Sequence, residues 1–518
     1  MFDGIGAHHL TDAQVRLNFT ASFHTLRICQ VAIIPAYEVR SLLYDYTSES
    51  AVPTGNRALY TRSYFYPFVA VFSPFSYSVL AEISRRAWFH YYTRLGAEIA
   101  FAPKTLVYNA DGRPYLDLKW LCEQDVAFAG LQPPVLRLNG APVAICAWEK
   151  PGLLAAFKLG RNQKKIADLL NSLSNEMPAI TARIQGWHKK VLALRWTQAE
   201  ILQIMEEIEQ FGTQSLMAYF AARHNLERSH NELVNLLPGD NAHQLHLINS
   251  ALSDLDGLTE LRLTGEILAL ARLAAADSKL MAWLAQPPTA NWTESVPPGR
   301  FADVLRHLLA GFGHWATDVG EMAHPTWTEK PELLLSAIVA CAKSQATEPQ
   351  RAPSSAARQQ LLDSVPGGAR KQAEQLLASL AALTILQSQA LHAFAYLLAG
   401  TRTWALAAGA EAAADGRLLD PQDVFLFELE EIKQMMTGEW NITHTNEIRQ
   451  RAEDRRSSYA RWQTRRAPAA FFGDAPAWLA RPGLPSNAAT SGWRVPALGA
   501  LGAAYDELVD GSAGTVEQ

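Results

Sequence analysis

The spacing of apolar residues becomes helical about a third of the way along the chain. From about residue 155 to about residue 465, apolar side chains recur every three or four positions, as they do on one face of a helix. The stretch RWTQAEILQIMEEIEQFG is typical: Thr197 and Glu200 form a capping box, and Ile201, Met205 and Ile208 then share one face. The pattern predicts a mainly α protein built around a large helical bundle.

Two turn signals precede the helical region. In TLVYNADGRPYLDL, apolar and aromatic residues flank Asp111 and Gly112, and VLRLNGAPVAICAW repeats the arrangement around Asn139 and Gly140. Such pairs between short apolar runs favour tight hairpin turns. We therefore expect a small β-hairpin subdomain in the N-terminal third of the chain.

These changes of pattern divide the chain into four parts. We expect an N-terminal extension (1–60), a mixed α/β-hairpin subdomain (60–155), a helical domain (155–470) and an irregular C-terminal tail (471–518). The tail is assigned from its richness in Ala, Pro and Gly.

One helical segment resembles a membrane span. Residues 375–401 carry no Asp, Glu, Lys or Arg and exceed the ~20 residues that a bilayer requires. However, Gln387, Ser388, Gln389 and His392 lie near the middle, where polar groups are costly in lipid. A helix buried at the centre of the bundle can pair these groups, so we expect a buried helix and no membrane partner.

Composition narrows the class of protein. The chain is 48% hydrophobic and 19% charged, with a formal charge of −5, and its 46 basic and 51 acidic residues are interspersed. No basic stripe suited to nucleic acid is present. The cysteines form no CxxC pair and the N-terminus shows no signal-peptide pattern, which favours reduced thiols and a cytoplasmic protein.

Several common chemical motifs are missing from the sequence. It contains no GxxxxGK[ST] loop, no complete GxGxxG turn and no GxSxG elbow. The pair His243 and His246 lacks the glutamate of HExxH. We therefore expect no metal site and no cofactor on this chain.

The segment FGHWATDVGEMAHPTWTEKPELLL, residues 312–335, concentrates polar and aromatic residues at the end of an expected helix. A metal site would need His314, Asp318 and His324 to converge, and their spacing specifies no such geometry. A second interpretation is that its tryptophans are core and its polar residues cap the helix. A third is a pocket lining, because residues 314, 318 and 321 share one face if the helix continues that far.

The same segment resembles a motif of the phosphoenolpyruvate-synthase-like family, FGHRxxxExxLxxPRWxExPxxLL. This family includes rifampicin phosphotransferase and the prodigiosin-forming ligases, and the motif belongs to its middle, acceptor-binding domain. Four other stretches are similar to motifs of that domain and occur in the same order: SPFSYSVL (73–80), LVYNADGRPYLDL, DGRLLDPQDVFLFELEEIKQM (415–435) and RRSSYARWQ.

The resemblance implies an acceptor-binding domain that lacks the parts performing phosphoryl chemistry. In the family, an ATP-grasp region phosphorylates a histidine on a swivelling domain, which carries the phosphate to the acceptor. Neither region is recognisable in this sequence. The resemblance thus implies ATP and Mg²⁺ on a partner that provides the ATP-grasp and swivelling phosphohistidine domains.

The departures from the family motif bear on the site. This chain has Trp315 and Val319 where the motif has Arg and Glu, retains Glu321, and has Gln387 and Ser388 where a later helix usually has an Arg-Glu pair. These exchanges suggest that a buried ionic network has been replaced by apolar and neutral groups. We therefore expect a pocket lining here. The catalytic candidates are His314 and Glu321, and the substrate-binding candidates are Trp315, Asp318, Trp327 and Gln387.

Three functions remain open from the sequence. The first is the acceptor-binding component of a split ATP-dependent phosphotransferase or ligase acting on a sizeable apolar metabolite. The second is a non-catalytic small-molecule-binding or adaptor protein derived from that domain. The third is autonomous acid/base chemistry through His314 and Glu321.

Overall fold

The computed structural model describes residues 52–53, 58–65, 71–133, 135–138, 141–239, 241–252, 255–286, 292–316, 319–343, 354–463, 470–472 and 508–510. Helices dominate these residues, and the strands are short and few by comparison. The predicted mainly α fold with a small β-hairpin region is confirmed. The predicted N-terminal extension and C-terminal tail lie almost entirely outside the described residues.

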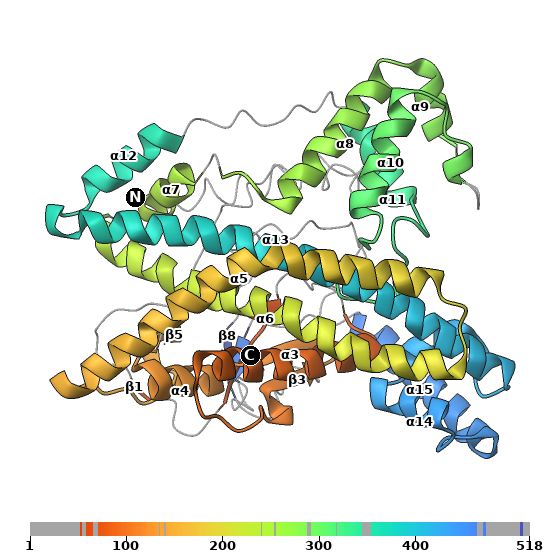
Figure 1. Ribbon diagram of the computed structural model, residues 1–518, viewed down its shortest axis with the longest axis horizontal. Coiled ribbons are helices and arrows are strands. Elements are labelled where there is room, and N and C mark those ends of the chain that lie inside the picture. Colours follow the sequence, from red (N-terminus) through yellow and green to blue (C-terminus); the bar gives the residue numbers. More distant parts are fainter. Residues whose placement is uncertain are drawn as a thin grey trace, which may run out of the picture.

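Three long helices cross the middle of the molecule side by side (Figure 1). They are α5 (Leu153–Ala193), α6 (Gln198–Leu236) and α13 (Arg370–Ala414). Half of the predicted capping box is present: the Thr197 side chain accepts a hydrogen bond from the backbone N–H of Glu200, whereas the Glu200 carboxylate accepts from the Thr197 hydroxyl. These helices form the frame on which the other elements pack.

Helix α13 is the apolar segment that resembles a membrane span. By length and composition, the region Gly367–Ala414 could cross a bilayer, and 61% of its most apolar window is buried inside the protein. Ser388 in its middle is paired with another helix: its Oγ accepts from the backbone N–H of Thr259 at 2.9 Å and donates to the Glu260 carboxylate. The structure therefore agrees with a helix buried at the centre of the bundle.

Shorter helices cover one side of this frame (Figure 1). Helices α8, α9, α10 and α11 form one group, and α7 packs on α12 near the beginning of α13. Their bounds are α7 Asn241–Ala251, α8 Thr259–Ala275, α9 Ser278–Leu284, η3 Trp292–Glu294, α10 Arg300–Phe312, α11 Glu332–Lys343, α12 Ser354–Ser364 and η4 Gly367–Ala369.

The opposite side carries the strands and the helices α3 and α4. Both predicted hairpins are confirmed: β3 pairs with β4 and β5 pairs with β6, each antiparallel. Asp111 and Gly112 adopt φ values of 51° and 72°, the left-handed conformation that a tight hairpin turn requires. The bounds are β1 Val52–Pro53, β2 Leu59–Thr61, η1 Ser63–Phe65, α3 Pro74–Leu95, η2 Lys104–Leu106, β3 Val107–Ala110, β4 Arg113–Asp117, α4 Leu118–Ala129, β5 Val135–Leu138 and β6 Ala141–Ala144.

Two strands that follow the last helix, β7 and β8, join the sheet formed by the N-terminal strands. Strand β2 lies between β4 and β7, and β7 also pairs with β8, which gives the order β3-β4-β2-β7-β8. Strand β1 pairs with β6 in a second small sheet. The remaining bounds are η5 Pro421–Leu426, α14 Leu429–Thr437, η6 Ile442–His444, α15 Thr445–Gln463, β7 Ala470–Phe472 and β8 Leu508–Asp510.

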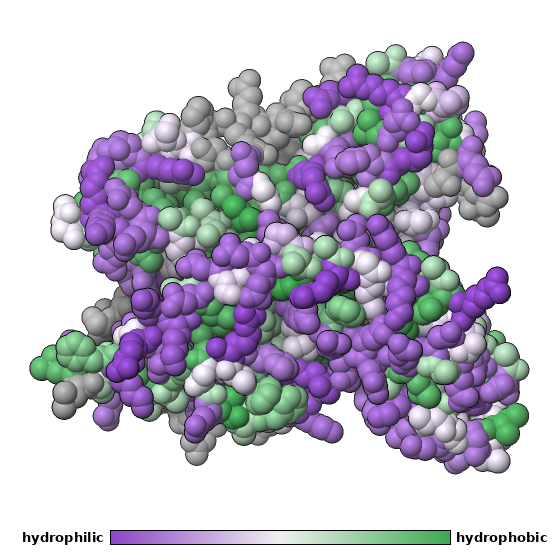
Figure 2. Space-filling view, in the orientation of Figure 1, coloured by the Kyte–Doolittle hydropathy of each residue, from purple (hydrophilic) through white to green (hydrophobic). Residues whose placement is uncertain are grey.

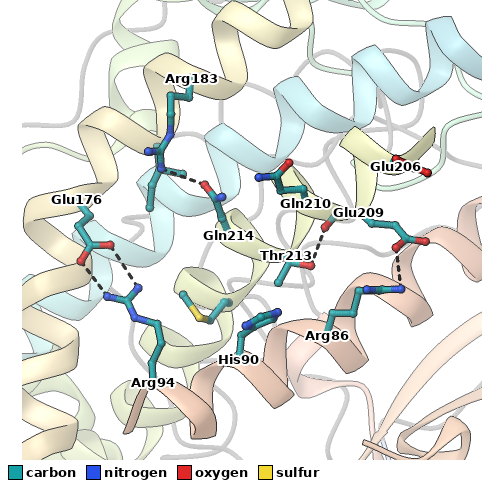
Figure 3. Close-up of a pocket in the computed structure, with 12 residues that line it drawn as sticks. Arg86, His90, Arg94, Glu176, Arg183, Glu206, Glu209, Gln210, Thr213 and Gln214 are labelled. Carbon is teal, nitrogen blue, oxygen red and sulfur yellow. Dashed lines mark hydrogen bonds and ion pairs between the residues drawn. The ribbon is translucent and has the colours of Figure 1, made fainter. Parts of the chain in front are cut away.

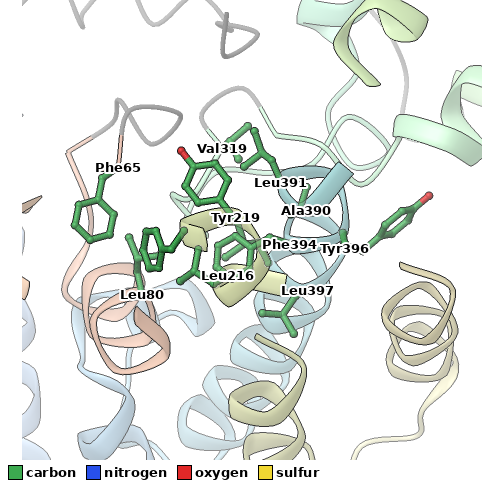
Figure 4. Close-up of a cluster of buried hydrophobic side chains, with 14 of the residues drawn as sticks. Phe65, Leu80, Leu216, Tyr219, Val319, Ala390, Leu391, Phe394, Tyr396 and Leu397 are labelled. Atoms are coloured by element: carbon green, nitrogen blue, oxygen red, sulfur yellow. The ribbon is translucent and has the colours of Figure 1, made fainter. Parts of the chain in front are cut away.

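The main core lies where α3, α6 and α13 meet. Figure 4 shows Leu80, Leu216 and Phe394 from these helices converging, with Val319 closing the cluster from a loop. Tyr396 points away from this cluster, on the side of α13 that faces α5 (Figure 4). On the surface drawn in Figure 2, hydrophilic side chains predominate and hydrophobic patches are scattered between them.

The cysteines differ in state. Cys122 and Cys146 are free and buried, as expected for reduced thiols. Cys341 is disulfide-bonded, which contradicts that expectation for this residue.

Candidate functional site

Helix α10 ends before most of the segment that the sequence singled out. Its last residue is Phe312, and Gly313 caps it by donating its backbone N–H to Leu309. A side chain at position 313 would collide with Thr328 Oγ1 and the Leu309 carbonyl, so glycine permits this close approach. His314 and Glu321 therefore do not share a helical face, and Asp318 lies outside the described residues.

The chain after α10 folds back on itself as a closed loop. Ala316 and Thr326 form an antiparallel bridge, and the backbone N–H of Trp327 donates to the Trp315 carbonyl at 2.8 Å. Both tryptophan side chains are 1% exposed, and their ring centroids lie 6.5 Å apart. Trp315 and Trp327 are thus core residues of this loop.

Glu321 binds the loop to the start of α3. Its Oε1 accepts hydrogen bonds from Ser73 Oγ (2.9 Å), Ser76 Oγ (2.9 Å) and the backbone N–H of Ala323 (2.7 Å). Its Oε2 accepts one from the backbone N–H of Ser73 at 2.6 Å. A carboxylate has about four lone-pair positions, so these contacts use its capacity. The geometry supports a structural role, strengthened by the positive end of the α3 dipole.

Arg402 holds the other side of the loop. This buried side chain on α13 donates to the Met322 and Ala323 carbonyls at 2.8 and 3.0 Å and pairs with Glu329 at 3.1 Å. Burial alone would raise the pKa of Glu329, but the ion pair with Arg402 lowers it below its usual value. The sequence interpretation did not include Arg402, whose partners lie 73 to 80 residues earlier in the sequence.

The space inside the loop is small. His314, Trp315 and Glu321 line a cavity of about 20 Å³ together with residues of α13. That volume holds about one water molecule. A sizeable ligand therefore has no room beside Trp315, and the expected pocket lining is tightly packed.

His314 belongs to a layer of rings between this loop and α5. Its ring stacks on Tyr396 with centroids 3.4 Å apart, and His392 and His188 lie 5.0 and 6.3 Å away. Burial lowers the pKa of His188 to about 4 and that of His392 to about 3, and it lowers the pKa of His314 well below its usual value. All three imidazoles are therefore neutral at neutral pH.

A large cleft opens on the other side of this layer. It has a volume of about 730 Å³, within the range of small-molecule sites. Its walls come from α5, from the start of α8 and from α13. They consist of Pro178, Thr181, Ala182, Gln185, Asp256, Gly257, Leu258, Thr259, Leu261, Arg262, Gly311, Gln389, His392 and Tyr396.

The polar groups of the cleft are fixed by contacts behind it. Trp315 Nε1–H, which can only donate, is 3.2 Å from His392 Nδ1. Nδ1 must therefore accept, and Nε2 of the neutral ring carries the proton as a hydrogen-bond donor. The Tyr396 hydroxyl donates to the Gly311 carbonyl at 3.3 Å and accepts from Gln185 Nε2 at 3.2 Å.

Arg262 supplies a positive charge at the cleft. Its side chain is exposed, lies 4.8 Å from the Phe312 ring centroid and makes no ion pair among the described residues. It also lowers the pKa of both His314 and His392, after the larger effect of burial, because a nearby positive charge disfavours their protonation. The cleft thus combines apolar and polar side chains, with one cation, Arg262, and one carboxylate, Asp256.

None of the candidate residues from the sequence that the structure describes lines the cleft, but two of them contact residues that do. His314 and Trp315 contact the ring layer behind the cleft, whereas Gln387 is buried in α13, does not line the cleft and leaves its Oε1 without a hydrogen-bond partner in the described structure. One feature of the sequence indicated a wall of the cleft: polar residues occur in the middle of the helical segment that carries no charged residue. Gln389, His392 and Tyr396 are spaced by three and four residues, so they share one face of α13.

Comparison with known proteins agrees with the suspected resemblance. Residues 210–404 match the family model of the rifampicin phosphotransferase fourth domain. No curated protein is detectably similar in sequence to this chain. The matched segment begins within α6, ends within α13 and covers less than half of the chain. Over this segment the chain is therefore similar to a phosphotransferase domain.

Proposed function

We propose that the cleft between α5, α8 and α13 binds an organic acceptor, and that the protein is the acceptor-binding component of a split ATP-dependent phosphotransferase or ligase. One observation carries the proposal: the walls supplied by α8 and α13 lie inside the segment similar to the rifampicin phosphotransferase fourth domain. A cleft of about 730 Å³ accommodates a sizeable metabolite.

The proposed acceptor is the sizeable, largely apolar metabolite expected from the sequence, and the lining would contact both its apolar parts and its hydrogen-bond acceptors. Leu258, Leu261 and Ala182 offer apolar contacts, while His392 Nε2–H and the Arg262 guanidinium are donors. Trp315 is a positioning residue in this proposal, because its Nε1–H determines which nitrogen of His392 carries the proton. His314 supports the same wall by stacking on Tyr396.

The phosphoryl group would come from outside this chain. Guanidinium groups commonly hold phosphate and developing negative charge, and the resembled motif has Arg where this chain has the buried Trp315. Within the described residues, no group of three or more His, Cys, Asp or Glu side chains is arranged to hold a metal ion. The proposal therefore assigns ATP, Mg²⁺ and the phosphohistidine to a partner.

A non-catalytic binding protein is the second candidate. The saturated carboxylate of Glu321 favours it, because an oxygen pair that is already occupied by four donors within the fold is not available as a base toward an acceptor. Both candidates require an occupied cleft, but only the first requires a partner.

Affinity purification of the protein from its native cell, followed by mass spectrometry, separates the two. Recovery of a protein with an ATP-grasp or swivelling-histidine domain would support the split enzyme. Recovery of neither with intact, folded bait would refute the split arrangement and favour the binding protein. Bait carrying Glu430→Gln, an exposed change remote from the cleft, is the matched control for handling.

A further inference from the structure

A second groove lies on the other side of α5. Residues of α3, α5 and α6 enclose about 600 Å³ between them (Figure 3). On α5, Glu176, Ile180 and Arg183 face this groove, whereas Thr181 and Gln185 face the cleft. The two spaces therefore share a wall and are lined by different residues.

Most of the charged groups in this groove neutralise one another. Arg94 pairs with Glu176 through two hydrogen bonds of 2.9 and 3.3 Å, and Arg86 pairs with Glu209 at 2.7 Å (Figure 3). Ion pairs of this kind leave little net charge to attract a ligand.

Arg183 and Glu206 are the exceptions, and Figure 3 shows them well apart in the groove. Arg183 is exposed, donates to Gln214 Oε1 at 3.0 Å and makes no ion pair with a carboxylate in the described part of the chain. A guanidinium has five N–H donors in a fixed fork, so Arg183 retains donors for a planar anion. Because Gln214 uses its oxygen for Arg183, its amide nitrogen is available as a neighbouring donor.

The floor beside Arg183 is apolar. Ile180 and Met217 line the groove and are 3% and 4% exposed, and His90 of α3 lines it as well (Figure 3). A methionine sulfur packs favourably against aromatic rings. The groove thus offers one charged end and one apolar surface.

We propose that this groove binds an organic monoanion, a carboxylate attached to an aromatic or otherwise apolar body. The carboxylate would lie against Arg183 and Gln214, and the body would lie over Ile180 and Met217. The flanking carboxylates of Glu176, Glu206 and Glu209 disfavour a dianion such as a phosphate monoester, because only one cation in the groove is not neutralised.

The proposal is tested by isothermal titration calorimetry with 2-naphthoate and its neutral analogue 2-naphthamide. Wild-type protein is expected to bind the carboxylate at least tenfold more tightly than the amide, since hydrogen bonds to a charged group are stronger than neutral ones. Arg183→Gln should weaken naphthoate binding at least tenfold. Arg161→Gln, an exposed change on the same helix outside the groove, should leave it unchanged.

Two further variants make the result decisive. Gln214→Glu would place a carboxylate beside Arg183 and should also weaken naphthoate binding at least tenfold. Ala182→Trp, which fills the neighbouring cleft, should not affect it. Equal affinity for acid and amide, an unchanged affinity in Arg183→Gln, or loss of binding in Ala182→Trp would each overturn the proposal, provided that circular dichroism shows the variants folded. None of these results depends on the acceptor-binding function.

Discussion

Replacing Glu321 by glutamine tests the structural role of this residue. The change preserves the size of the side chain but removes its charge and converts one oxygen into an NH₂ group. Oε1 accepts three hydrogen bonds and Oε2 accepts one, all from buried or nearly buried donors. The best orientation of glutamine keeps its oxygen at the Oε1 position and turns the NH₂ toward the backbone N–H of Ser73.

The expected loss follows from these contacts. The Ser73 N–H loses its acceptor, which costs about 2 kcal/mol for a buried donor. The three bonds to Oε1 become bonds to a neutral oxygen, and charge-assisted bonds are roughly twice as strong as neutral ones, so each weakens by about 1 kcal/mol. Glutamine is neutral, so the variant no longer bears the cost of burying a charged carboxylate, and this offsets part of the lost hydrogen-bond energy. We expect Glu321→Gln to lower the free energy of unfolding by about 4 kcal/mol.

Urea denaturation followed by circular dichroism measures this difference. Glu430→Gln is the matched control, because Glu430 is exposed and its ion pair with Lys433 spans 3.8 Å, so its effect should stay within about 0.5 kcal/mol. If the free energy of unfolding of Glu321→Gln lies within about 1 kcal/mol of the wild-type value, Glu321 is not a saturated buried acceptor.

Two further predictions concern the ring layer behind the cleft. The pKa of His188 is lowered to about 4 and that of His392 to about 3. Below about pH 6.5, the unfolded chain therefore binds more protons than the folded chain. The free energy of unfolding should fall by roughly 1.4 kcal/mol per pH unit for each ring as the pH drops from 6.5 toward 4. Thermal unfolding across this range should show a smaller slope in His392→Gln than in His307→Gln, whose imidazole is exposed, and equal slopes would contradict burial of His392. Trp315→Arg should lower stability by about 3 to 5 kcal/mol, because it buries a charge beside a carboxylate already fully used by other donors; an unchanged melting temperature would contradict the burial of Trp315.

The sequence predicted correctly those elements whose formation depends on residues close together in the chain. The Asp111-Gly112 turn predicts its hairpin because few residue pairs adopt two left-handed conformations in succession. Thr197 predicts the start of α6 because its side chain satisfies a backbone N–H that the helix leaves open. The polar residues inside the charge-free helical segment predict burial within the protein, because such groups are costly in lipid, and Ser388 is indeed paired with Thr259 and Glu260 of α8.

The site depends on contacts that no local pattern contains. The end of α10 follows from the close approach of Thr328 to Gly313, which requires the loop to fold back. Glu321 meets Ser73 across 248 positions in the sequence, so its saturation could not be inferred from a helical spacing. The cleft likewise needs α5, α8 and α13 to be placed together, although the three-and-four spacing of Gln389, His392 and Tyr396 marked one of its walls.

The most direct test of the account asks whether small molecules from the native cell occupy the cleft. Wild-type protein and the variants Ala182→Trp and Ala156→Trp would be incubated with a metabolite extract, purified, and analysed by native mass spectrometry. Both alanines are exposed on α5, but only Ala182 lines the cleft. The account predicts a bound metabolite in the wild type and in Ala156→Trp, and its loss in Ala182→Trp. A metabolite retained equally by all three proteins, or by none, would contradict the cleft as the acceptor site.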